Sequence, residues 1–252
     1  MQNNIDVIGV IPARYESTRL SHKLLRQVLG KPLIQWVWEN ASKASLLDDL
    51  IIACDDIKVK EAAESFGAKA VMTSTKHQSG TDRIAEAVRD IDAKIVINIQ
   101  ADEPVMHQST IDSLAREMVN NPTILMATVR KKIEANEDAN NPNVVKLICD
   151  KNDFAIYFSR YPIPYYRDGS IEKKYYKHLG IYAYTKDFLY TFKNLPSSFL
   201  ESAERLEQLR VIEAGYKIKV IETKFESIGV DTEEDLQKIE SVLNERKAKD
   251  AK

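Results

Sequence analysis

An apolar run near the N-terminus reads Val7-Ile8-Gly9-Val10-Ile11-Pro12-Ala13-Arg14. Its β-branched residues predict a buried strand over 7–11, and Pro12 marks the start of a basic loop. Between Pro12 and Lys31 the chain carries five cations and one acid, although the net charge of all 252 residues is −2. Ligands of open α/β sheets bind beyond the carboxyl ends of the strands. The loop therefore predicts a place for a polyanion such as a nucleoside triphosphate, with a solvated basic loop as the alternative.

Short apolar runs alternate with segments of helical period through the first half of the chain. Strands are predicted over 50–54, 70–72 and 95–99, and helices over 33–44, 57–66 and 81–91. Pro32 precedes the first of these helices, Trp36 is expected at the flank of its apolar face, and Gly67 ends the second. This alternation is typical of a parallel sheet that helices cover on both faces.

The pattern changes from about residue 124. Apolar runs over 124–129, 144–149, 154–158 and 179–184 follow one another without long helices between them, which predicts antiparallel additions and a mixed sheet. Residues 202–214 are predicted helical, 218–221 form a last strand, and Thr232 with Asp235 is expected to cap a C-terminal helix. We expect a single α/β domain over 1–252, in which about 141–190 form a subdomain or dimerisation arm.

Composition excludes several classes of protein. Lysine and arginine number 36 against 38 acids, so no basic field exists to hold nucleic acid. Cys54 and Cys149 are 95 residues apart and the four histidines lack metal-ligand spacing, which argues against disulfide and zinc frameworks. No apolar run approaches the 18 residues of a membrane span. We therefore expect a soluble, cytoplasmic protein that binds neither nucleic acid nor membrane.

The eight glycines form neither a dinucleotide-binding G-x-G-x-x-G nor a Walker G-x-x-x-x-G-K-[ST] motif. A bound phosphate would therefore be held largely by side chains, which gives the cations of the basic loop their interest.

Two acids from distant parts of the chain suggest a metal site. The run Asn98-Ile99-Gln100-Ala101-Asp102-Glu103-Pro104 carries a predicted strand directly into carboxylates, and Asp231 lies 129 residues beyond Asp102. Hard oxygen donors at a strand end suit Mg²⁺, which would also neutralise phosphates. The alternatives are an ordinary acidic turn for Asp102 and a helix cap for Asp231.

Further polar residues stand at element ends. Arg160 ends a predicted strand, His178 precedes another, and Glu207 and Gln208 lie on a predicted helix. Together they could supply partners for a carboxylate and for sugar hydroxyls, although a surface ion pair, a structural histidine and solvated helix positions are the alternatives. The segment 77–83 opens a helix, where backbone N–H groups can hold an anion or read a base, or form an ordinary cap.

Eight collinear segments resemble the 3-deoxy-manno-octulosonate (Kdo) cytidylyltransferases, also called CMP-Kdo synthetases. They are VIPARYESTRL (10–20), HQSGTDR (77–83), QADEP (100–104), NPNVVK (141–146), YFSR (157–160), HLGIY (178–182), LEQLR (206–210) and GVDT (229–232). The resemblance implies a nucleotide-diphospho-sugar transferase (glycosyltransferase-A-like) fold and a homodimer. It also implies formation of CMP-Kdo and pyrophosphate from CTP and Kdo, with Mg²⁺, for lipopolysaccharide biosynthesis.

The resemblance also implies roles for individual residues. Contacts to the CTP phosphates would come from Arg14, Arg19 and Lys23, and the cytidine side would be lined by Pro12, Ala13, Thr73, Ser79, Gly80 and Arg83. The ulosonate sugar would be lined by Gln100, Arg160, His178, Tyr182, Glu207 and Gln208. Asp102 and Asp231 would bind Mg²⁺ and, with Lys23, form the catalytic set.

Three segments depart from the family pattern. Leu20-Ser21-His22-Lys23-Leu24-Leu25 replaces the usual Leu-Pro-Gly-Lys-Pro-Leu, which keeps the lysine but not the proline and glycine. Ala101 replaces a typical glycine, and residues 167–176 form a shorter segment. Because of them, three alternatives stay open: transfer to 8-amino-8-deoxy-Kdo, transfer to another ulosonic acid such as sialic acid, or a non-catalytic nucleotide-binding dimer.

Overall fold

Four parallel strands form one half of the central sheet, and all of them come from the first half of the chain. In spatial order they are β6 (Ala93–Asn98), β1 (Ile5–Ala13), β4 (Asp49–Cys54) and β5 (Lys69–Met72), here called the parallel half. The computed structural model describes residues 5–17, 19–134 and 139–250. All four strands were predicted from their apolar runs.

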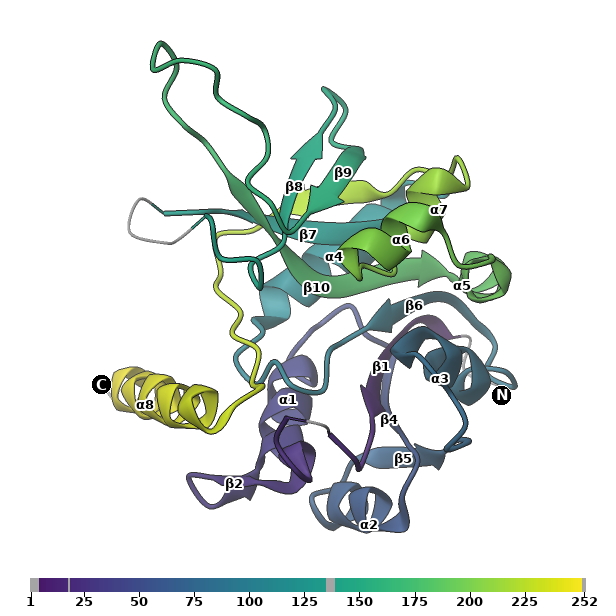
Figure 1. Cartoon of the computed structure of the whole chain (residues 1–252). Coiled ribbons are helices and arrows are strands. Elements are labelled where there is room, and N and C mark those ends of the chain that lie inside the picture. Colours follow the sequence, from purple (N-terminus) through teal and green to yellow (C-terminus); the bar gives the residue numbers. More distant parts are fainter. Residues whose placement is uncertain (1–4, 18, 135–138, 251–252) are drawn as a thin grey trace.

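The remaining strands form the mixed half. They are β7 (Met126–Lys132), β8 (Lys146–Cys149), β9 (Ala155–Ser159), β10 (Tyr176–Thr185) and β11 (Lys219–Glu222). β10 lies between β6 and β7 and is antiparallel to both, β11 is parallel to β7, and β8 and β9 form a hairpin beside β10 (Figure 1). The predicted antiparallel additions and mixed sheet are therefore confirmed.

Side-chain alternation along the strands produces two cores, one on each face of the sheet. In β1, Val7 and Ile11 pack into one core, whereas Ile8 and Val10 pack into the other. The first core is covered by α1 (Leu33–Ala41), α2 (Ile57–Ser65) and α4 (Gln108–Asn120). The second is covered by α3 (Gly80–Ala87), α5 (Lys186–Asn194) and α7 (Leu209–Glu213). Burying each of these aliphatic side chains stabilises the fold by about 1.5–3 kcal/mol.

In a third apolar cluster the C-terminal helix α8 (Glu233–Asp250) packs against α1 and a small two-stranded ribbon (Figure 1). The ribbon consists of β2 (Gln27–Val28) and β3 (Lys31–Pro32). Trp36 is buried in this cluster, beside the face of α1 that packs on the first core, so its expected place at the flank of that face is confirmed. Its indole N–H donates to the Val28 carbonyl at 2.8 Å, which satisfies its polar atom. As predicted, Thr232 and Asp235 form the reciprocal cap of α8.

The helices differ from the sequence-based expectation in four places. α3 ends at Ala87 instead of residue 91, and neither α4 nor α5 was predicted. The single helix expected over 202–214 is two short ones, α6 (Phe199–Glu204) and α7, because Arg205 adopts a left-handed conformation (φ 54°). In the described residues, no helix combines the length and apolarity needed to span a bilayer.

Candidate active site

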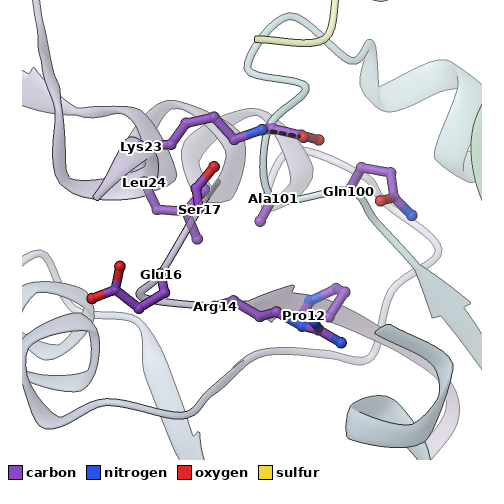
Figure 2. Close-up of a pocket in the computed structure, with 9 residues that line it drawn as sticks. Pro12, Arg14, Glu16, Ser17, Lys23, Leu24, Gln100 and Ala101 are labelled. Atoms are coloured by element: carbon purple, nitrogen blue, oxygen red, sulfur yellow. Dashed lines mark hydrogen bonds and ion pairs between the residues drawn. The ribbon is translucent and has the colours of Figure 1, made fainter. Parts of the chain in front are cut away.

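The loops beyond β1 and β6 enclose a pocket of about 160 Å³ at the carboxyl edge of the parallel half. It is lined by Pro12, Arg14, Glu16, Ser17, Lys23, Leu24, Gln100, Ala101 and Asp102. Figure 2 shows Arg14 and Pro12 on one side of this pocket and Lys23 on the other. The pocket thus lies where the sheet rule and the basic loop predicted a ligand.

Lys23 joins the two acids that the sequence singled out. It lies at the start of a single 3₁₀ turn (Lys23–Leu25), and its Nζ donates to Asp102 Oδ2 at 2.7 Å and to Asp231 Oδ1 at 3.1 Å. Burial alone lowers the pKa of Lys23, but the two carboxylates outweigh burial and the pKa lies above its ordinary value. The ammonium is therefore permanently charged, and the fold brings Asp102 and Asp231 to one point.

Backbone and side-chain bonds hold the two acidic loops together. The Val230 N–H donates to the Asp102 carbonyl at 2.9 Å, and the Ser227 hydroxyl donates to Glu103 Oε2 at 2.5 Å. Asp231 is placed by the cap of α8, since its N–H donates to Asp235 Oδ2 at 3.0 Å. The helix is therefore capped by Thr232 and Asp235, and not by the Asp231 side chain as the alternative interpretation had it. The Asp231 carboxylate is left to face Lys23.

Arg14 and Arg19 supply further positive charge at this edge. Arg14 is exposed and lines the pocket, and Arg19 Nη2 lies 2.8 Å from Asp231 Oδ2 with 63% of its side chain exposed. Exposed arginines next to a buried lysine are suited to a triphosphate, because guanidinium groups bind phosphate oxygens in pairs.

The residues expected on the cytidine side gather around the end of β1. Gly80 opens α3 beside Pro12, where an added Cβ would lie 3.5 Å from Pro12 Cγ. Ser79 caps α3, and the buried Thr73 donates its hydroxyl to the Cys54 carbonyl at 2.9 Å. The start of α3 therefore lies beside the end of β1, and Thr73 joins the end of β5 to the end of β4. Contact of these residues with cytidine stays a prediction.

Arg83 lies behind this surface and is fully buried. Its Nη2 donates to Asp55 Oδ2 at 2.8 Å and its Nη1 to Thr73 Oγ1 at 2.6 Å. The other oxygen of Asp55 accepts the Tyr15 N–H at 2.9 Å. Arg83 therefore supports the first turn of the basic loop through Asp55, and its direct contact with cytidine stays a prediction.

Three of the residues expected on the sugar side lie where β10 pairs with the end of β6. Tyr182 pairs with Asn98 across the two strands, Gln100 donates to Asn98 Oδ1 at 3.2 Å, and an added Cβ on Gly180 would lie 3.6 Å from Gln100 Cγ. The His178 and Tyr182 rings are 5.3 Å apart. Gln100 thus connects the pocket to β10.

His178 is a neutral, internally bonded side chain. Its Nε2 lies 2.9 Å from Thr128 Oγ1, and because that hydroxyl donates to the Ile181 carbonyl at 2.8 Å, the imidazole is the donor. Burial lowers the pKa of His178 to about 3.

Glu207 and Gln208 stand between α6 and α7. Burial raises the pKa of Glu207, whose Oε2 accepts the Thr81 hydroxyl at 2.9 Å, and Gln208 is 4% exposed. Glu207 thereby ties the start of α3 to the mixed half of the sheet.

Arg160 is engaged by backbone carbonyls. Its Nε donates to the Glu204 carbonyl at 2.7 Å, its Nη1 to Pro142 at 2.9 Å and its Nη2 to Arg205 at 3.4 Å. These bonds satisfy the carbonyls around the helix break at Arg205. Arg160 therefore has a structural task, and its contact with a sugar carboxylate stays a prediction.

Two acids near the pocket were not assigned from the sequence. Asp55 follows β4 directly, so the reasoning that selected Asp102 at the end of β6 would also have found it. Burial raises the pKa of Glu103 to about 7, although the Ser227 hydroxyl opposes this shift. Glu103 follows Asp102 in the same loop, and its side chain approaches β10. A Cβ added to Gly180 would lie 3.5 Å from Glu103 Oε1.

The donor set is suited to magnesium bound together with a phosphate. Among residues 5–17, 19–134 and 139–250, no three His, Cys, Asp or Glu side chains gather closely enough to hold a metal by themselves. Mg²⁺ commonly takes one or two protein carboxylates and completes its coordination with substrate phosphates and water. Asp102 and Asp231 meet that requirement.

Two of the three departures from the family pattern lie in this pocket or next to it. Ala101 lines it and is 7% exposed. His22, at the position of the usual glycine, takes the left-handed conformation (φ 50°) that a glycine would adopt more readily. The loop therefore keeps a left-handed turn before Lys23 without glycine.

Comparison with known proteins gives close matches along nearly the whole chain. A family model described as cytidylyltransferase matches residues 8–221. A 3-deoxy-manno-octulosonate cytidylyltransferase from Solibacter usitatus is 48% identical over 233 residues, which covers 92% of each chain. A solved structure of CMP:2-keto-3-deoxy-manno-octonic acid synthetase complexed with CTP has a TM-score of 0.91 and 40% identity, and covers 96% of this chain and 99% of its own.

A more distant structure shows the breadth of the fold. The 4-diphosphocytidyl-2C-methyl-D-erythritol synthase from Anaerococcus prevotii is 14% identical with a TM-score of 0.62, and covers 96% of this chain and 97% of its own. These neighbours confirm the predicted nucleotide-diphospho-sugar transferase fold, with its mixed, mostly parallel central sheet.

Proposed function

The chain belongs to the 3-deoxy-manno-octulosonate cytidylyltransferase family, and from this premise we propose that it forms CMP-Kdo and pyrophosphate from CTP and Kdo with Mg²⁺. The observation that carries the proposal is the Lys23 ammonium bonded to both Asp102 and Asp231 at the phosphate-facing loop. That cluster places a fixed cation and two carboxylates beside one pocket.

The cations of the pocket act on the triphosphate during the reaction. The anomeric hydroxyl of the sugar attacks the α-phosphorus of CTP, a new phosphorus–oxygen bond forms, and the bond to pyrophosphate breaks. Lys23, Arg14 and Arg19 hold the triphosphate in line and offset the negative charge that grows on the departing pyrophosphate. These cations are in place before substrate binds, so little reorganisation is needed during the reaction.

Asp102 and Asp231 would hold the magnesium ion. When bound, the ion neutralises phosphate charge and polarises the α-phosphate. The partial exposure of both carboxylates, 32% for Asp102 and 41% for Asp231, leaves them accessible to a hydrated cation.

The sugar would bind over β10, beside Gln100 and Tyr182. Gln100 and Tyr182 offer an amide and a hydroxyl group there, and Arg160, His178, Glu207 and Gln208 are proposed to line the sugar together with these two residues. Transfer to 8-amino-8-deoxy-Kdo or sialic acid is the runner-up reaction, since the same groups could accept either acid.

A pyrophosphate-release assay with CTP and Mg²⁺ tests the proposal. We expect turnover with Kdo that greatly exceeds turnover with 8-amino-8-deoxy-Kdo or sialic acid. Turnover with one of the other acids and none with Kdo would reject the sugar assignment. CTP binding without pyrophosphate release on any of the three would instead support a non-catalytic nucleotide-binding dimer.

A homodimer is part of the same proposal. The segment between β9 and β10 extends away from the sheet in Figure 1, and it carries Tyr161, Tyr165 and Ile171 with 79%, 86% and 67% of their surfaces exposed. Large exposed apolar side chains on a projecting segment are typical of a protein interface. Light scattering coupled to gel filtration should give twice the mass of one chain.

The cytoplasm is the proposed location. Cys54 and Cys149 are both free thiols in the structure, as suits a reducing compartment. Fractionation of cells that produce the protein should place it with the cytoplasmic enzymes.

A further inference from the structure

The basic loop is closed on itself by two stacked rings. The Tyr15 and His22 rings lie with their centroids 4.2 Å apart and their planes 24° from parallel. Residue 15 follows Arg14, residue 22 precedes Lys23, and Arg19 lies between them. The contact therefore joins the two ends of the segment that carries the proposed phosphate ligands.

Tyr15 is fixed from three sides. Its N–H donates to Asp55, which the buried Arg83 holds from behind. Its hydroxyl accepts from Lys58 Nζ at 3.0 Å, and that ammonium lies 4.8 Å from the centre of the ring. Because its ring also packs against the core beneath β1, Tyr15 gives His22 a rigid surface to stack on.

His22 has a backbone conformation that favours this stack. Its left-handed φ of 50° is costly for a residue with a Cβ, and its carbonyl accepts the Leu25 N–H at 2.9 Å to begin the turn at Lys23. Stacking with Tyr15 offsets that cost, because offset aromatic contacts are favourable beyond the area they bury. The stack thus adds a contact next to the turn that aims Lys23 at Asp102.

We propose that the Tyr15–His22 stack holds the triphosphate-binding loop in its binding conformation before the nucleotide arrives, with Tyr15 and His22 as positioning residues for Arg19 and Lys23. The inference rests on the proposed function in that the nucleotide is CTP. A loop ordered in advance binds more tightly, because less conformational entropy is lost on binding. Neither ring needs to touch the nucleotide for this effect.

The test is calorimetric titration of CTP into the whole protein with Mg²⁺ present. Tyr15→Leu and His22→Asn each remove one ring, and asparagine tolerates the left-handed conformation at position 22. Each variant should bind CTP about three- to tenfold more weakly, the range expected for loss of one aromatic pair. The double variant should bind no more weakly than either single variant, because both changes remove the same contact.

Three further measurements separate positioning from general damage. Tyr15→Phe and His22→Phe keep the stack and should bind CTP within about twofold of the wild type. Tyr216→Leu removes a ring contact of similar size, with Phe188 at 5.0 Å, at the opposite edge of the sheet and should leave CTP binding unchanged. In turnover, the stack variants should raise the KM for CTP while the KM for the sugar stays near wild type.

Several results would overturn the inference. Unchanged CTP affinity in both single variants, additive losses in the double variant, or an equal rise in the KM for the sugar would each refute a positioning role of the stack. Loss of binding in the ring-retaining phenylalanine variants would do the same. A wild-type protein that binds no CTP would refute the proposed function and this inference with it, whereas normal wild-type binding with unaffected variants refutes the inference alone.

Discussion

The parallel half of the sheet carries its candidate phosphate and metal residues on loops beyond strand ends, whereas the mixed half carries its candidate sugar residues within β10, after β9 and between α6 and α7. Arg14 and Arg19 in the first half are exposed, but Arg160 in the second half donates to three backbone carbonyls. Loop side chains can serve a ligand at little structural cost. Side chains of the mixed half hold the fold and are also proposed to line the sugar, so changing them should affect both.

The largest expected effect comes from replacing Asp102, which follows β6, or Asp231, which precedes α8. Asp102→Ala and Asp231→Ala should each lower turnover by about 1,000-fold or more, because the charge on the triphosphate is no longer balanced. The melting temperature should stay near wild type, since Lys23 keeps the other carboxylate. Pyrophosphate release and thermal unfolding measure the two quantities.

Glu233→Gln provides a matched control on the same loop region. Glu233 pairs with Arg26 on the surface at 2.7 Å and lies outside the pocket, so turnover should be unchanged. Turnover within tenfold of wild type in either aspartate variant would remove that residue from the proposed metal site.

The second-largest effect tests how much a residue of the mixed half contributes to the stability of the fold. Arg160→Ala leaves the carbonyls of Pro142, Glu204 and Arg205 without their donor, which should cost about 1–3 kcal/mol of stability. The melting temperature should fall by several degrees, about 2–4 °C per kcal/mol for a chain of this size. A raised KM for the sugar with an unchanged melting temperature would show that Arg160 is a ligand residue only.

The third effect is a pH dependence from the same half. The pKa of His178 is about 3 when folded, below the ordinary value of about 6.5 that it regains on unfolding. The unfolded state therefore takes up the proton first, and stability is lost as the pH falls from about 6.5 toward 3. Urea unfolding at pH 7 and pH 5 should show that His178→Gln loses about 1–2 kcal/mol less than wild type on acidification. Equal losses in both proteins would mean that His178 is not buried in its neutral form.

The smallest effect returns to the parallel half. Arg19→Ala should raise the KM for CTP about three- to tenfold and leave the KM for the sugar and the melting temperature unchanged, because this side chain is mostly exposed. Arg26→Ala removes an exposed arginine that pairs with Glu233 instead, and should leave all three quantities unchanged. A higher KM for the sugar in Arg19→Ala would show that Arg19 acts on the sugar, and would contradict its assignment to the CTP phosphates.

The same contrast explains what could be predicted from the sequence. Lys23 and Asp102 could be placed at one edge of the sheet in advance because their loops follow two parallel strands, β1 and β6. Asp231 precedes α8, and only the family resemblance joined it to them. The apolar runs of β1, β4, β5 and β6 were equally legible, since strands buried on both faces are continuously apolar.

The mixed half was less predictable because its arrangement depends on non-local contacts. The run over 179–184 indicates a strand, but only pairing with β6 and β7 inserts β10 between them and brings Tyr182 opposite Asn98. The break at Arg205 follows from carbonyls that Arg160 satisfies from 45 residues away. No local pattern contains either contact, and the one-domain division over 1–252 with an arm near 141–190 stays a prediction.

Calorimetric titration of CTP with and without Mg²⁺, in the wild type and in Asp231→Ala, tests the central claim most directly. The account predicts that Mg²⁺ strengthens CTP binding to the wild type by at least about tenfold and that Asp231→Ala loses this strengthening. An equal gain from Mg²⁺ in both proteins would contradict it, because the cation would then be held without the carboxylate that the fold brings to Lys23 and Asp102.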